Sequence, residues 1–83
     1  MQNWILMAQN SKGQNLRACS QIADETIPSQ QAAQLLADKL EREEPGFIVK
    51  EAYRIHKDMS REELEALDFF PHGCLAEVFV FDQ

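Results

Sequence analysis

The sequence predicts a single small α+β domain whose elements follow the order ββαβ(α)β. Four short segments have the apolar patterns of strands, and one segment after the second strand repeats its apolar residues with helical spacing. The chain has 83 residues, which suffice for one hydrophobic core but not for two. We therefore expect residues 1–83 to form one domain around a four-stranded mixed sheet, with one main helix and a short second helix.

The first two strands are expected to form a hairpin. Residues 2–9 are a short apolar run, and residues 15–24 alternate between apolar and polar side chains. Gly13 lies between them, and a glycine can take the positive φ that tight turns require. This pattern favours pairing of the two strands as antiparallel neighbours.

The main helix is expected over about residues 28–44. Pro28 is tolerated only in the first turn of a helix. Pro45 and Gly46 end the helix, because proline restricts the residue before it and glycine permits the exit turn. One helix face carries the apolar residues Ala33, Leu36, Ala37 and Leu40.

The remaining elements are two strands and a short helix. Residues 47–57 alternate, but Glu51 interrupts the apolar positions, which is typical of an edge strand or a bulge. Ser60 and Glu63 have the spacing of a capping box, which predicts a short helix over about residues 60–67. Residues 74–81 are mostly apolar and form the last predicted strand.

The faces of the strands predict their order in the sheet. The first and last strands are apolar on both faces, which favours the middle of a sheet, whereas the second and third are apolar on one face only. This pattern predicts the order 2-1-4-3, with the first and fourth strands adjacent and parallel, and leaves other orders open. The layout resembles the β-grasp, ubiquitin-like arrangement in the order of its elements, although no sequence motif carries the resemblance.

The formal net charge of −6 is unevenly distributed. Residues 1–23 contain no acid, and all 14 acids lie between Asp24 and Asp82. Because an acidic field repels nucleic-acid phosphates and anionic membrane surfaces, we expect neither direct nucleic-acid binding nor membrane binding. The same charges are also ordinary for a solvated helix face, where they serve solubility alone.

Several features predict a soluble cytoplasmic protein. No apolar run approaches the roughly 18 residues that span a bilayer, and the first residues lack the basic region of a signal peptide. Two cysteines do not make a disulfide scaffold. These features favour a reduced, intracellular setting.

No group of residues predicts catalysis, so the protein is not expected to be an enzyme. Of the soft metal ligands Cys19, Cys74, His56 and His72, only His72 and Cys74 are close in sequence. No third residue orients that pair as nucleophile and base, and the three glycines do not form a phosphate-binding loop. We therefore expect no metal and no cofactor.

The expected function is binding of another protein through two surfaces. A single long helix covers only one face of a sheet, so part of the other face is expected to remain apolar and exposed. Trp4 is expected on that face as an interface anchor, with core packing as its alternative role. The predicted edge strand near Tyr53 would allow strand addition or a homodimer. An acidic helical surface would steer a partner with a basic surface, and its residues are Glu41, Glu43, Glu44, Glu62 and Glu63.

Two other functions are consistent with the size of the chain. One is an acidic decoy that inhibits a nucleic-acid-binding complex, as phage anti-CRISPR proteins can do; charge layout and size alone favour it. The other is a ubiquitin-like conjugated or carrier protein. The tail over residues 80–83 lacks the Gly-Gly end that such chemistry uses, which argues against this second function.

Overall fold

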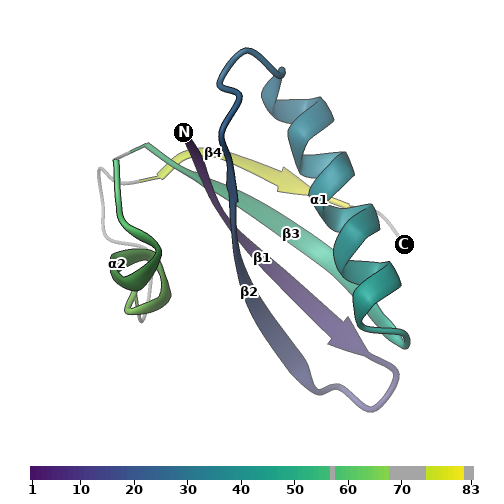
Figure 1. The fold of residues 1–83 in the computed structure, drawn as a ribbon. Helices are drawn as coiled ribbons and strands as arrows, with labels where there is room; N and C mark the ends of the chain where they lie inside the picture. The colour runs from purple at the N-terminus through teal and green to yellow at the C-terminus, as the bar shows by residue number, and fades with distance from the viewer. Residues whose placement is uncertain (57, 68–74, 82–83) are drawn as a thin grey trace.

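The computed structural model describes residues 1–56, 58–67 and 75–81, which form a small α+β domain (Figure 1). Two helices lie on a four-stranded sheet, so the predicted α+β class, with four strands and two helices, is confirmed. The elements in chain order are β1 (Gln2–Asn10), β2 (Asn15–Ile22), α1 (Ser29–Glu43), β3 (Phe47–Ile55), α2 (Arg61–Glu65) and β4 (Leu75–Val80).

The sheet is antiparallel throughout, in the order β2-β1-β3-β4. The predicted order 2-1-4-3 is therefore wrong, and so is the predicted parallel pair of first and last strands. β1 pairs with both β2 and β3, whereas β4 lies at an edge and pairs with β3 alone among the described strands. The resemblance to the β-grasp arrangement is not confirmed, because the first and last strands are not neighbours in this sheet.

A β-bulge in β3 explains the error in the predicted strand order. Met7 pairs with Glu51 but Ala8 pairs with Val49, so β3 carries one extra residue at this point. Val49 packs toward α1 before the bulge, and Ala52 does so after it. The bulge changes which alternate residues face α1. The apolar pattern of β3 is therefore broken although β3 is a central strand. Of the two explanations for Glu51, the bulge is correct and the edge strand is wrong.

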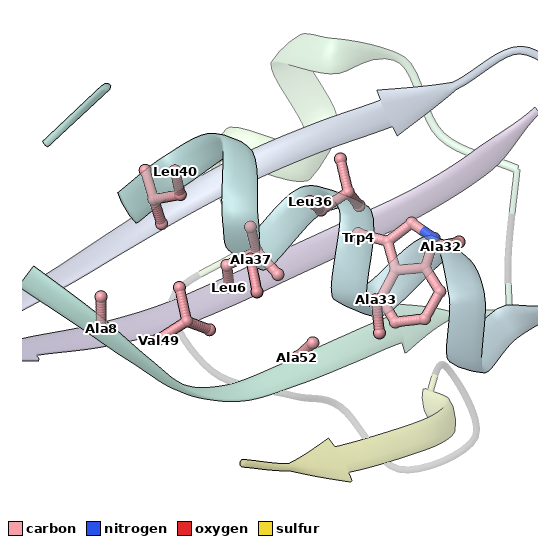
Figure 2. Packing of buried hydrophobic residues seen from close by; sticks show 10 residues of the cluster. All are labelled: Trp4, Leu6, Ala8, Ala32, Ala33, Leu36, Ala37, Leu40, Val49 and Ala52. Atoms are coloured by element: carbon pink, nitrogen blue, oxygen red, sulfur yellow. The ribbon is translucent and has the colours of Figure 1, made fainter. Parts of the chain in front are cut away.

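The larger core lies between α1 and the sheet (Figure 2). Trp4 is completely buried there, and its ring centroid lies 5.9 Å from that of Phe79 on β4. The expected placement of Trp4 on the uncovered face is therefore wrong. The helix presents short side chains to the sheet, which leave room for the indole ring; they are Ala32, Ala33 and Ala37.

A smaller core lies on the opposite face of the sheet, beneath α2. Ile5 of β1, Ile55 of β3 and Leu64 of α2 are buried together. The predicted capping box starts α2: the Ser60 side chain accepts a hydrogen bond from the Glu63 N–H, and the Glu63 carboxylate accepts one from the Ser60 N–H. Since α2 has only five residues, it covers only part of this face.

The boundaries of α1 and the two glycine turns agree with the sequence prediction. Pro28 immediately precedes the helix, which ends at Glu43. Gly13 and Gly46 have φ values of 79° and 96°, so both turns use backbone conformations that favour glycine.

Candidate protein-binding surfaces

The sheet face beneath α2 carries exposed apolar side chains where the helix does not reach. Val78 lies opposite Tyr53 and Val80 lies opposite Glu51, while Met7 of β1 pairs with Glu51 from the other side. Val78 and Val80 are 43% and 70% exposed. We call the set Met7, Glu51, Tyr53, Val78 and Val80 the open face.

Exposed large hydrophobic residues are concentrated on this side of the sheet. Apart from the first methionine, those in the described part of the chain are Leu35, Ile48, Val78 and Val80. Ile48 lies between Phe47 and Val49, which both pack toward α1. Side chains alternate along a strand, so Ile48 lies on the same side of the sheet as the open face. Only Leu35 of the four belongs to a helix, and apolar groups gathered on one side of a sheet are typical of interaction surfaces.

Tyr53 occupies the middle of the open face and is held by Glu51. Its hydroxyl donates a hydrogen bond to the Glu51 carboxylate at 2.5 Å. Burial raises the pKa of Tyr53 to about 12, and the hydrogen bond to Glu51 adds to the shift. Tyr53 therefore stays neutral near pH 7 and presents an oriented aromatic ring.

The edge strand next to Tyr53 is β4, not the strand to which Tyr53 belongs. β3 is paired on both sides, so the prediction of an edge at Tyr53 is wrong. The Phe81 N–H donates to the Lys50 carbonyl at 2.9 Å. The alternation of an antiparallel ladder then directs the backbone N–H and C=O groups of Val78 and Val80 outward. An exposed edge with β-branched residues favours pairing with a further strand.

The predicted acidic residues do not form one surface. α1 and α2 pack on opposite faces of the sheet (Figure 1). Glu41 is partly buried and accepts a hydrogen bond from the Val49 N–H at 2.9 Å, so it joins α1 to β3. Glu63 closes the capping box of α2. Of the five predicted acids, the other three are exposed and make no ion pair with a described residue: Glu43 on α1, Glu44 directly after it, and Glu62 on α2.

A polar cluster that the sequence reasoning missed lies at the start of α1. The Ser29 hydroxyl donates to the Glu77 carboxylate at 2.6 Å and accepts a hydrogen bond from the Arg54 guanidinium at 2.5 Å. Arg54 also lies 3.8 Å from Glu77. The first turn of α1 contains no acid, so Glu77 supplies the negative charge that a helix N-terminus favours. In the sequence, the signal for this cluster is Glu77, a single acid in an otherwise apolar strand.

Cys19 and the histidines do not form a metal site in the described structure. The Cys19 thiol donates to the Leu64 carbonyl at 3.7 Å, and burial raises its pKa. Within residues 1–56, 58–67 and 75–81, no three His, Cys, Asp or Glu residues are placed to hold a metal ion. His72 and Cys74, which are close in sequence but were not expected to form a site, lie outside the described residues. None of the described helices is long and apolar enough to cross a membrane.

Comparison with known protein families, with curated proteins and with solved structures finds no match to this chain. The surfaces of the molecule are therefore the basis on which a function can be proposed.

Proposed function

We propose that this protein is a small non-enzymatic binding module, a regulator or inhibitor, that contacts another protein through the open face and the edge of β4. The observation that carries this proposal is the clustering of exposed apolar residues on one side of the sheet, two of them on an edge strand. Water in contact with such groups is released when a partner covers them, and that release stabilises the complex.

The acidic charge of the chain supports a partner with a basic surface. Glu43 and Glu44 are exposed at the end of α1, and the net charge is −6. Charges of this kind mainly increase the rate of association with an oppositely charged protein. A free thiol at Cys19 suits a reducing compartment, so we propose the cytoplasm as the site of action.

The acidic decoy is a weaker alternative. Its charges would have to imitate a continuous line of phosphates, but α1 and α2 carry their acids on opposite faces of the sheet. Glu41 and Glu63 are also occupied by hydrogen bonds to the backbone.

The double variant Val78→Lys/Val80→Lys tests the proposal, with Leu35→Lys as its matched control on α1. All three positions are exposed, so we expect each variant to remain folded, with changes within about 0.5 kcal/mol. Affinity capture from the native host cell should recover a partner with the wild type and with Leu35→Lys, but not with the double variant. Recovery by all three proteins would contradict the proposal.

Sedimentation velocity separates a second copy from a different partner. If the wild type forms a dimer that the double variant dissociates, the open face is a homodimer interface. If the wild type is a monomer, the captured protein is the partner.

A further inference from the structure

The other edge of the sheet, β2, borders a groove that the proposed function does not use. The groove has a volume of about 310 Å³ and lies between β2 and the second half of α1. Ala18, Leu36 and Leu40 form its apolar part, and Lys39, Glu43 and Arg61 are the charged residues that line it. Strand β2 therefore has a helix beside its free edge, with a space between them.

The outer backbone groups of β2 face this groove. The Asn10 N–H donates to the Gln14 carbonyl at 3.1 Å, which fixes the pattern of bonding pairs along the hairpin. Because bonding pairs alternate in an antiparallel ladder, Cys19 and Gln21 direct their N–H and C=O groups away from β1. Both residues line the groove, and β2 has no second neighbour among the described strands.

The charge around β2 differs from that of the rest of the chain. The hairpin has no acid and carries Lys12 and Arg17. Lys39 and Arg61 add two cations at the groove, against the single carboxylate of Glu43 among the lining residues. Lys39 makes no ion pair with a described residue, whereas Arg61 pairs with a glutamate of its own helix. When that glutamate, Glu65, is counted, the hairpin and the groove together carry four cations and two carboxylates, so this edge is locally basic in an acidic protein.

We propose that the β2 edge binds an extended acidic peptide segment of another protein, which adds to the sheet as a fifth strand beside α1. The backbone of the peptide bonds to Cys19 and Gln21, in the mode by which sheet edges recognise extended peptides. Its side chains alternate, so aliphatic groups enter the groove over Leu36 and Leu40 while acidic groups on the other side lie near Arg61. The recognised segment therefore alternates aliphatic and acidic residues. This site is separate from the open face, so neither proposal depends on the other.

Fluorescence anisotropy with the labelled heptapeptide Glu-Val-Glu-Val-Glu-Val-Glu tests this inference, with Lys replacing Glu in the control peptide. We expect saturable binding of the acidic peptide alone. The double variant Lys39→Glu/Arg61→Glu should weaken binding about tenfold or more at low salt, with a smaller difference at high salt, because exposed charges are screened. Val78→Lys/Val80→Lys should leave the affinity unchanged.

A second pair of variants tests the strand pairing itself. Cys19→Pro removes the outward N–H, and Cys19→Ala removes the same thiol contact but keeps the N–H. We expect Cys19→Pro to abolish peptide binding and Cys19→Ala to retain it. If Cys19→Pro does not fold, the Lys39→Glu/Arg61→Glu variant and the amide shifts of Cys19 and Gln21 on peptide addition decide the question.

Four results of the peptide experiments would overturn the inference. They are no saturation up to about 1 mM peptide, equal binding of the lysine peptide, equal binding by the two Cys19 variants, and amide shifts at Val78 and Val80 instead of Cys19 and Gln21. A wild-type dimer that Cys19→Pro dissociates and Cys19→Ala does not would show that a second copy occupies the edge, which also overturns the peptide proposal.

Discussion

The two faces of the sheet are covered to different extents by their helices. α1 has 15 residues, and ten buried residues, five of them its own, form the core between it and the sheet. α2 has five residues, and three buried residues, one of them its own Leu64, form the core between it and the sheet. β1 contributes to both, so one strand supports a closed core on one side and a partly exposed surface on the other. The comparison separates two roles: substitutions beneath α1 should affect folding, whereas those on the open face should affect binding.

The largest effect is expected for Trp4→Ala, which removes the largest side chain of the α1 core. The loss of buried surface and the cavity should cost about 3–5 kcal/mol. A domain of this size has a total stability of roughly 4–12 kcal/mol, so the variant should be close to unfolded. Urea denaturation followed by circular dichroism measures the loss, with Trp4→Phe as a milder variant. A cost below about 1 kcal/mol would show that the α1 face is not the main source of stability.

Leu64→Ala tests the second face. Truncation of a buried leucine costs about 2–5 kcal/mol, and we expect the lower part of that range because the short helix α2 can move inward. Hydrogen exchange should then accelerate at the amides of Leu64 and Ala66, which bond within α2, while amides of β1 stay protected. A cost equal to that of Trp4→Ala, with global loss of protection, would remove the difference between the two faces.

Gln2→Ala tests a buried polar connection at the α1 side. Gln2 is 1% exposed, and its amide donates to the carbonyls of Asp24 and Ile27 at 3.1 and 3.0 Å and accepts from the indole N–H of Trp4 at 2.9 Å. The variant leaves these groups without their partner, which should cost about 1–3 kcal/mol. Gln9→Ala is the control, because Gln9 is exposed on the same strand. Equal stability of the two variants would mean that the connection contributes nothing.

The smallest expected effect is the shifted titration of Tyr53, the only tyrosine in the chain. Its pKa of about 12 in the folded protein lies above the unfolded value of about 10. The stability that this shift contributes is therefore fully present below pH 10 and is lost as the pH rises toward 12. The ultraviolet absorbance of tyrosinate should give a midpoint near 12 in buffer and near 10 in urea, and Glu51→Gln should lower the first value. Identical midpoints in buffer and urea would mean that the open face does not shield Tyr53.

Features that depend on neighbouring residues could be predicted from the sequence. The capping box of α2, the start of α1 after Pro28 and the turns at Gly13 and Gly46 each follow from a few adjacent residues. The order of the strands could not, because it depends on the bulge at Glu51 and on an edge strand with exposed valines. An apolar strand at an edge has the same sequence pattern as a strand buried on both faces.

The predicted binding residues divide according to their tertiary contacts. Tyr53 lies on the open face, and Glu43, Glu44 and Glu62 are exposed. The sequence does not show which face of β1 the helix covers, so the burial of Trp4 could not be predicted. It also does not show that Val49, eight residues beyond Glu41, presents an N–H to that carboxylate.

The central position of β1 affects how the sheet assembles during synthesis. β2 follows β1 after a short turn, so these strands can pair early, but β3 is complete only when Ile55 has been added. At roughly 5–20 residues per second, a ribosome takes a few seconds over that interval. The second edge of β1 has no partner during this time and could pair with another nascent chain. Because the hairpin carries Lys12 and Arg17 and no acid, two such hairpins repel each other while they wait for β3.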